Sequence, residues 1–351
     1  MTTIKAYGTE SAEADLEQME IERRDLLEND VKIDILYCGV CHSDIHAAKN
    51  DWENTTYPLV PGHEIVGRVV EVGSKVDNYK EGDLVGVGCM VDSCQKCGAC
   101  EDDLEQFCEE GMVGTYNGKN EHTGKQTFGG YSTSITVKDD FVLKVPENLD
   151  IKAVAPLLCA GITTFSPLNH WKIKEGDKVG VVGLGGLGHM GIKFAHAMGA
   201  ETIMITTSPN KAEDAKRLGA DAVLISKDED EMEEHKGTFD FLLNTVPVKH
   251  DINPYLNLLK RDSTMVMVGA IEPLEPMHGG SIIMGRKRVA GSLIGGIKET
   301  QEMLDFCGEH DIVSDVEMID MKDINNAFER VTNSDVKYRF VIDMESLKNE
   351  Q

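Results

Sequence analysis

The fold is decided by residues 178–191, which read Lys-Val-Gly-Val-Val-Gly-Leu-Gly-Gly-Leu-Gly-His-Met-Gly. The apolar run 178–182 is typical of a buried strand, and residues 186–198 have the length of a helix. Between them the pattern G-x-G-x-x-G gives a tight turn, a close backbone approach to a pyrophosphate, and close packing of helix on strand. The stretch predicts a dinucleotide-binding turn, and the alternative is a glycine-rich turn without a ligand. The expected cofactor contacts here are Gly183, Gly185, Gly186, Leu187 and Gly188.

Strand-like and helix-like segments alternate after this turn. Apolar, strand-like runs lie at 201–207, 222–225, 239–245, 264–269 and 289–295, and helix-like segments lie at 210–220 and 252–260. This alternation predicts a doubly wound parallel sheet with helices on both faces.

The first 150 residues have a different rhythm. Short strands broken by glycine are expected at 31–40, 65–73, 83–88 and 131–137, which indicates a small, irregular, β-rich domain. After 296 the chain offers two amphipathic helices at 298–310 and 322–331 and a strand at 338–343. We expect this tail to rejoin the first domain.

The charge balance is strongly acidic. The chain of 351 residues carries 61 Asp and Glu against 35 Lys and Arg, a formal net charge of −26. Such a surface repels phosphate backbones and anionic lipid, so neither nucleic acid nor a membrane is an expected partner. The acidic run at 228–234 is interpreted as part of this solvated surface. Without an apolar h-region at residues 1–18 or an apolar run of 18 residues, a cytoplasmic protein is expected.

Four of the nine cysteines share one loop, with the spacing Cys94-x2-Cys97-x2-Cys100-x7-Cys108. Four thiolates suit a closed, tetrahedral structural zinc. The ligands alone would also suit an iron–sulfur cluster, which a dinucleotide-binding architecture disfavours. Cys89 falls outside the spacing and receives no role, and Cys38 and Cys307 are expected in the core.

A second set of metal-ligand residues is dispersed: Cys41, His63 and Cys159. Two thiolates and one imidazole leave a fourth zinc position open, as a catalytic site requires. From spacing alone, the alternative is that the two cysteines are ordinary core residues.

The strand that follows the glycine turn, at 201–207, lacks a carboxylate at its carboxyl end, where an NAD-binding chain usually has one. Glu201 lies at its amino end instead. Hydroxyls and a lysine follow the strand and can surround a 2′-phosphate, so NADP(H) is the expected cofactor. The residues concerned are Thr206, Thr207, Ser208 and Lys211.

The motifs together resemble the zinc-containing medium-chain alcohol dehydrogenases, most closely the cinnamyl-alcohol-dehydrogenase-like group. The matching segments are GVCHSDIH (39–46), PGHEIVGRV (61–69), the four-cysteine loop, PLLCAGITT (156–164), GLGGLGHMG (183–191), NTVPV (244–248), GRKRVAGSLIGG (285–296) and DVKYRFVID (335–343). The resemblance implies a GroES-like catalytic domain at 1–155 and 296–351, carrying two zinc sites, and a Rossmann domain at 156–295. It also implies a homodimer.

Residue roles follow from the resemblance. Cys41, His63 and Cys159 resemble the catalytic zinc ligands, Glu64 matches a carboxylate that can approach the metal, and Asp44 resembles the partner that orients the histidine. Ser43 and His46 would relay the proton, while Trp52 and Met90 would line the substrate pocket, with parts of 112–114 and 271–295. Further expected cofactor contacts are His42, Thr163, Thr245, Val246, Gly269, Ser292, Ile294 and Arg339.

The implied reaction is hydride transfer between nicotinamide and an alcohol or aldehyde whose oxygen is polarised by zinc. Plant cinnamyl enzymes have a tryptophan shortly after the fourth structural cysteine, where this chain has Met112-Val113-Gly114. A broad reductase of aromatic and aliphatic aldehydes is therefore expected rather than an enzyme for lignin precursors. The competing hypotheses are an NAD-dependent alcohol or polyol dehydrogenase, a silent homologue, and a zinc-ribbon protein binding nucleic acid, which the net charge disfavours.

Overall fold

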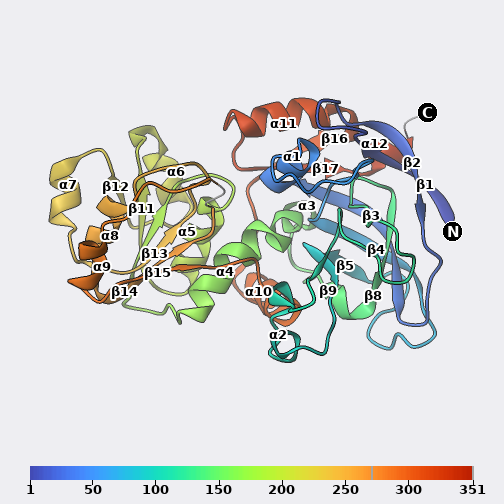
Figure 1. Ribbon diagram of the computed structural model, residues 1–351, viewed down its shortest axis with the longest axis horizontal. Coiled ribbons are helices and arrows are strands. Elements are labelled where there is room, and N and C mark those ends of the chain that lie inside the picture. The colour runs from blue at the N-terminus through green and yellow to red at the C-terminus, as the bar shows by residue number, and fades with distance from the viewer. Residues whose placement is uncertain (270–271, 350–351) are drawn as a thin grey trace. The chain divides into compact units, whose positions relative to one another are not determined.

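The computed structural model describes residues 1–269 and 272–349, and it divides the chain into two units. Unit 1 comprises Met1–Cys159 and Gly295–Gln351, and unit 2 comprises Ala160–Ile294 (Figure 1). The expected boundary after residue 155 is therefore four residues too early. The consequence is that Cys159 belongs to unit 1, together with the other cysteines of both clusters.

Unit 2 is built on a six-stranded parallel sheet in the order β12-β11-β10-β13-β14-β15. Counted from β10, this is the order 3-2-1-4-5-6 of the Rossmann fold, so the predicted doubly wound sheet is confirmed. The strands are β10 Lys178–Val182, β11 Glu201–Thr206, β12 Ala222–Ile225, β13 Phe239–Asn244, β14 Leu259–Met267 and β15 Arg288–Gly291.

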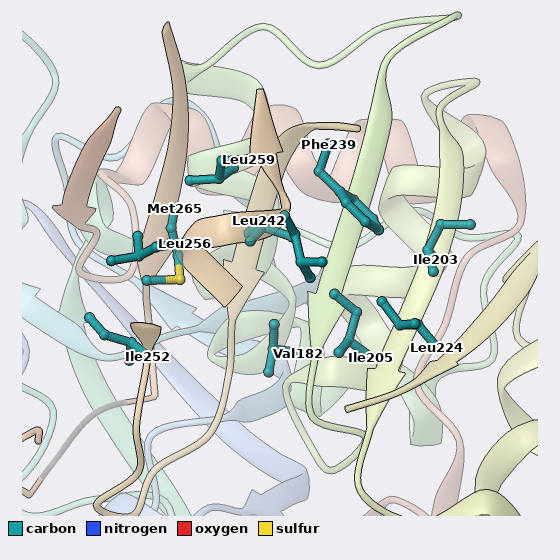
Figure 2. Packing of buried hydrophobic residues seen from close by; sticks show 11 residues of the cluster. Val182, Ile203, Ile205, Leu224, Phe239, Leu242, Ile252, Leu256, Leu259 and Met265 are labelled. Atoms are coloured by element: carbon teal, nitrogen blue, oxygen red, sulfur yellow. The ribbon is translucent and has the colours of Figure 1, made fainter. Parts of the chain in front are cut away.

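Helices connect these strands, and apolar side chains between helix and sheet form the core. The helices are α4 Ala160–His170, α5 Gly188–Ala197, η4 Pro209–Lys211, α6 Ala212–Arg217, α7 Glu229–Glu234, α8 Asn253–Leu258 and α9 Gly279–Ile283. Figure 2 shows one cluster, in which Ile205, Phe239 and Leu242 from the strands lie with Leu256 of α8. Fully burying each such side chain contributes roughly 1.5–3 kcal/mol.

Unit 1 contains a seven-stranded sheet in the order β16-β17-β3-β4-β5-β9, with β8 paired to β3. Its pairs are antiparallel except β16 with β17. The strands are β3 Asp30–Val40, β4 Ile65–Val72, β5 Leu84–Val87, β8 Ser134–Lys138, β9 Leu143–Lys144, β16 Val316–Asp320 and β17 Arg339–Asp343. Because β16 and β17 come from the tail, the tail does rejoin this unit.

Two small antiparallel pairs and short helices complete unit 1. The pairs are β1 Thr2–Gly8 with β2 Glu17–Arg23, and β6 Met90–Asp92 with β7 Val113–Gly114. The helices are α1 His42–Ala48, α2 Gly98–Glu101, η1 Glu105–Phe107, η2 Asp139–Phe141, α3 Ile151–Val154, η3 Ala155–Leu158, α10 Ile297–His310, η5 Met321–Asp323, α11 Ile324–Thr332 and α12 Glu345–Asn349.

The acidic run at 228–234 lies at the surface, as expected, and its residues Glu229–Glu234 form helix α7, in which none is buried. Asp228 caps the helix by accepting hydrogen bonds from the backbone N–H groups of Asp230 and Glu231. Carboxylates in a first helical turn also interact favourably with the helix dipole.

Among the described residues, no single helix has the length and hydropathy to cross a membrane. One bent pair, Ile151–Leu158 with Ala160–His170, meets the criterion by length and composition alone.

Candidate metal centres and cofactor turn

The first candidate metal centre begins where β3 passes into α1. Cys41 is the N-cap of α1, and its backbone N–H donates to Oδ2 of Asp44 at 2.9 Å. The other carboxylate oxygen of Asp44 accepts from the backbone N–H of Gly62 at 3.0 Å and lies 2.9 Å from Nδ1 of His63. One buried carboxylate therefore holds together two segments that each carry a possible ligand.

His63 lies in one group with two thiols, and because Nδ1 is engaged by Asp44, Nε2 is the nitrogen left for a metal. The Sγ atoms of Cys41 and Cys159 lie 3.8 Å apart, and both group with His63 and Glu64 so that one ligand atom of each lies within 4.8 Å of the others. Two sulfurs bound at about 2.3 Å to a tetrahedral zinc are about 3.8 Å apart. The donor set and its spacing fit a zinc ion.

The electrostatics of this cluster favour the thiolate form of Cys41 and make the imidazole of His63 more basic. The pKa of the Cys41 thiol is held well below its ordinary value, first by a hydrogen bond from Cys159 and then by the charges of Arg339 and His63. Burial alone would lower the pKa of His63, but the Asp44 carboxylate raises it well above its ordinary value. A thiolate and a more basic imidazole are better metal ligands.

Glu64 faces a buried cation as well as the thiols. Its Oε1 forms an ion pair with Nη2 of Arg339, and the same nitrogen donates to the carbonyl of Val40 at 2.9 Å. The other oxygen, Oε2, is buried without a hydrogen-bond partner and lies against Gly39, where an added Cβ would be 1.9 Å away. Burial raises the pKa of Glu64 to about 7, against the opposing effect of Arg339. Arg339 is thus already paired inside unit 1, and its expected contact with cofactor phosphate stays a prediction.

Two neighbours of this cluster were missed from the sequence. The Sγ of Cys89 approaches the carbonyl of Leu158 at 3.7 Å, and its hydrogen bonding with Cys159 helps to raise the pKa of that thiol. The ring of Tyr116 lies 5.6 Å from the ring of His63. Cys89 lies one residue before β6 and shows no ligand spacing, and nothing in the sequence around Tyr116 signals the contact.

The second candidate centre is the four-cysteine loop, whose members all lie within 4.8 Å of one another by their sulfurs. Cys94 and Cys100 are 3.9 Å apart by their sulfurs, close to the tetrahedral zinc spacing given above. The N–H groups of Cys94 and Glu109 donate to the sulfurs of Cys108 and Cys97, both at 3.4 Å. Backbone donors, that of Glu109 first, lower the pKa of Cys97 to about 6, which favours the thiolate.

Helix α1 also carries the residues expected to move the proton. Ser43 Oγ lies 3.7 Å from Cys41 Sγ, and His46 follows three residues later, on the same side of the helix. His46 Nδ1 lies 2.7 Å from Oδ2 of Asp51, and its ring is 5.5 Å from that of Trp52. His42 is exposed, with its ring 6.3 Å from that of His46, whereas Met90 is buried at the start of β6.

The glycine turn of unit 2 has the predicted local geometry. Gly183 adopts φ +95°, and a Cβ at Gly188 would lie 2.0 Å from the carbonyl oxygen of Gly183. Gly185 is exposed, and a Cβ there would meet nothing within 4 Å, so its backbone is open to a ligand. The turn therefore fits a pyrophosphate at the amino end of α5.

Lys211 reaches this turn from the end of the next strand. Its Nζ donates to the carbonyl of Leu184 at 3.0 Å, and the N–H of Ser208 donates to Oγ1 of Thr206 at 3.1 Å. Glu201 lies at the other end of β11, where it pairs with Lys178 at 3.0 Å. A lysine, rather than a carboxylate, therefore stands beside the glycine turn.

Other expected cofactor residues lie at the carboxyl ends of neighbouring strands. Thr245 Oγ1 donates to the carbonyl of Val182 at 2.9 Å, and a Cβ at Gly269 would be 2.3 Å from the carbonyl oxygen of Thr245. The N–H of Ser292 donates to Met267 at 3.2 Å, just after β15. The remaining positions are Thr163, buried in α4, exposed Thr207, Gly186 and Leu187 in the turn, Val246 after β13, and Ile294 with φ +35°. Residue 271 of the expected pocket segment lies outside the described residues.

Comparisons with known proteins agree with both units. Residues 27–147 match the family model described as alcohol dehydrogenase GroES-like domain, and residues 186–309 match the one described as zinc-binding dehydrogenase. The chain is 57% identical to the aldehyde reductase YahK of Escherichia coli over 98% of this chain and 99% of the relative.

Two solved structures are similar over nearly their whole length. The cinnamyl alcohol dehydrogenase SbCAD4 of Sorghum bicolor has a TM-score of 0.95 and 44% identity, covering 100% of this chain and 99% of that one. The cinnamyl alcohol dehydrogenase of Helicobacter pylori, solved in complex with NADP(H), has a TM-score of 0.91 and 41% identity, covering 98% of both chains.

Proposed function

This chain belongs to the zinc-containing medium-chain alcohol dehydrogenases, in their cinnamyl-alcohol-dehydrogenase-like group, and we propose that it is an NADP(H)-preferring reductase of aromatic and aliphatic aldehydes. Membership makes it an alcohol dehydrogenase by class of reaction. The observation that carries the proposal is the convergence of Cys41, His63 and Cys159, with the two sulfurs at 3.8 Å.

We propose that these three residues hold a catalytic zinc. When bound, the metal supplies Lewis-acid stabilisation of negative charge on the substrate oxygen, and nicotinamide supplies or accepts the hydride. The chain's own contribution is orientation, because Asp44 fixes the ring of His63 through Nδ1 and leaves Nε2 for the metal. Glu64 is held beside the thiols by Arg339 and offers a further carboxylate oxygen.

A second zinc in the four-cysteine loop would give two ions per chain. Four protein ligands leave no open position, so this site would hold the loop in place and take no part in the reaction. The close sulfurs of Cys94 and Cys100 and the backbone donors to Cys97 and Cys108 support it.

The reaction also needs a route for one proton, which we assign to Ser43 and His46 on α1. The hydroxyl of Ser43 exchanges the proton with the substrate oxygen, and His46 exchanges it with solvent. His46 suits the second role because it is partly exposed and hydrogen-bonded to the carboxylate of Asp51.

The preference for NADP(H) is supported by the lysine beside the glycine turn. Lys211 is held at the carbonyl of Leu184, and hydroxyl-bearing side chains stand at 206–208, where the strand ends. A 2′-phosphate would gain charge-assisted hydrogen bonds there. The similar Helicobacter enzyme was solved with NADP(H). A cytoplasmic homodimer completes the proposal.

The test is metal analysis combined with steady-state assays of the purified protein. Two zinc ions per chain, turnover of benzaldehyde with NADPH, and a clear preference for NADPH over NADH are expected. Turnover of sorbitol with NAD and not of benzaldehyde with NADPH would favour the polyol dehydrogenase alternative. Two separate sites predict that Cys100→Ser and Cys41→Ser each retain one zinc ion per chain. Loss of both ions in Cys41→Ser would contradict this assignment.

A further inference from the structure

A buried amide stands at the carboxyl end of β13, next to the glycine turn. The side chain of Asn244 is fully buried, and its Oδ1 accepts from the backbone N–H of Val246 at 3.1 Å. Because that N–H can only donate, the oxygen of the amide must face Val246. The amide nitrogen, Nδ2, therefore points the other way, and it lies 2.8 Å from Nε2 of His250.

This orientation fixes the protonation of His250. Nδ2 of Asn244 is a donor, so Nε2 of His250 has to accept. The other ring nitrogen, Nδ1, lies 2.7 Å from the carbonyl oxygen of Val248 and has to donate. Only the neutral tautomer with the proton on Nδ1 satisfies both hydrogen bonds. In a protonated imidazole, the N–H at Nε2 would face the N–H group of Asn244, and neither could accept.

The segment that this network holds is the one packed against the dinucleotide turn. Thr245 donates to Val182 through its hydroxyl, and a Cβ at Gly183 would lie 2.9 Å from that same oxygen. Val246 approaches the same glycine, with a methyl 3.2 Å from the Cβ position. A shift of residues 245–248 would therefore reach the backbone expected to receive the pyrophosphate.

We infer that His250 is a positioning residue for the cofactor: through Asn244 it holds residues 245–248 against the Gly183–Gly188 turn in the form that binds the dinucleotide. This inference rests on the proposed function, since it assumes that the turn binds NADP(H). In this inference, His250 touches neither the substrate nor the reacting atoms and acts only by positioning the cofactor-binding segment. It also makes cofactor affinity depend on an imidazole remaining neutral.

The charged residues near His250 come from its own loop and from the segment after β14. Lys249 and Asp251 flank it in the loop, and the ring of Tyr255 from α8 lies 6.3 Å away. From the segment after β14, Glu272 accepts from the N–H of Lys249, and Glu275 pairs with its ammonium at 3.1 Å. These carboxylates are engaged by Lys249, so the contact with Asn244 is the one that a proton on His250 would break.

The test measures the dissociation constant of NADP⁺ by calorimetry for the zinc-loaded enzyme at pH 8 and pH 6. His250→Gln keeps a side-chain acceptor for Asn244 but does not take up a proton in this range. His250→Leu removes the acceptor. The matched control is His235→Gln, a histidine beyond the other end of β13 whose ring faces Phe239.

At pH 8, His250→Gln is expected to bind within about twofold of the wild type, and His250→Leu about fivefold more weakly, the factor that one hydrogen bond typically carries. Between pH 8 and pH 6 the wild type and His235→Gln are expected to lose more affinity than His250→Gln. The 2′-phosphate of the cofactor also titrates near pH 6, at about the value of a phosphate monoester. Comparing variants with one ligand cancels this contribution.

Equal affinity of His250→Leu and the wild type at pH 8, or equal pH dependence of His250→Gln and the wild type, would overturn the inference. Should His250→Leu fold poorly in thermal unfolding, the pH comparison with His250→Gln decides alone. If the wild type binds NAD⁺ but not NADP⁺, the cofactor choice is wrong, and the same variants are measured with NAD⁺, which shares the pyrophosphate. If it binds neither, the proposed function fails before the variants are compared.

Discussion

Asp44 and His63 are joined by a buried hydrogen bond of 2.9 Å between Oδ1 and Nδ1. The same carboxylate accepts from the backbone N–H groups of Cys41 and Gly62 and from the hydroxyl of Tyr131 at 3.3 Å. A fully buried anion with this many donors is fixed in place, so it fixes in turn the ring of His63 and the start of α1.

Asp44→Asn should weaken zinc binding by about 10- to 100-fold, the range for residues that orient metal ligands. An amide lacks the charge that raises the basicity of His63, and it cannot accept all the hydrogen bonds that Asp44 receives. Competition with a chelator measures the effect. Asp51→Asn, at an exposed carboxylate, is the control and should bind zinc normally. Equal zinc affinity of Asp44→Asn and the wild type would show that orientation by Asp44 is unimportant.

Gly39→Ala should destabilise the protein by about 1–3 kcal/mol, the usual cost of overpacking a core. A Cβ at Gly39 would lie 1.9 Å from Oε2 of Glu64, so the carboxylate must shift, and its other oxygen is the one paired with Arg339. Denaturant unfolding measures the loss. Gly280→Ala on α9, where a Cβ meets open space, should change the free energy of unfolding little or raise it. Similar effects of the two substitutions would contradict the packing argument.

Lys211→Ala should raise the KM for NADPH by about tenfold or more, because a hydrogen bond to a charged group contributes about 1.5–3 kcal/mol. The KM for NADH should change little, since NADH lacks the 2′-phosphate. Steady-state kinetics with both cofactors separate the two effects. Lys216→Ala, an exposed lysine on α6, serves as the charge-matched control. An equal rise for NADPH and NADH would remove Lys211 from phosphate recognition.

His46→Gln should lower kcat by about 10- to 100-fold near neutral pH, at or below the lower end of the range for general acid–base groups. The KM for the cofactor should stay unchanged, because the role assigned to His46 is proton exchange. The pH–rate profile should lose the limb that belongs to an imidazole. His122→Gln replaces an exposed histidine of the same unit and should leave the profile intact. An unchanged rate and profile in His46→Gln would exclude it from the relay.

Tyr79 should make the free energy of unfolding depend on pH above pH 10. Burial, with the nearby carboxylates of Asp139, Asp140 and Asp83, raises the pKa of Tyr79 to about 12, and its hydroxyl donates to Val142 at 2.5 Å. A raised pKa means that the folded state holds the proton more tightly. The stabilisation is therefore complete below pH 10 and is lost as the pH rises through 12.

Denaturant unfolding of the wild type and Tyr79→Phe between pH 8 and pH 12 measures this dependence. The wild type should be the more stable by about 1 kcal/mol, the contribution of one hydrogen bond, up to pH 10. The difference between the two proteins should then shrink toward pH 12. A difference that stays constant over this range would mean that Tyr79 titrates equally in the folded and unfolded chain.

Local features of this protein could be read from its sequence. The order of the strands in unit 2 follows from apolar runs and the glycine turn, and the spacing of Cys94, Cys97, Cys100 and Cys108 lies within one loop. The hairpin β1–β2 and helix α7 were not predicted, since polar and acidic residues obscure the alternation that marks such elements.

The first metal cluster depended on the tertiary structure. Cys41 and Cys159 are 118 residues apart in the chain, and Glu64 and Arg339 are 275 apart. No local pattern links such residues, because their contact depends on how β17 pairs with β3 and how η3 leads to Cys159. From the sequence alone the trio was a set of dispersed ligand types, made specific only by a family resemblance. The approach of Cys89 and Tyr116 to the cluster, and the neutral tautomer of His250, are decided by packing and hydrogen bonding between segments.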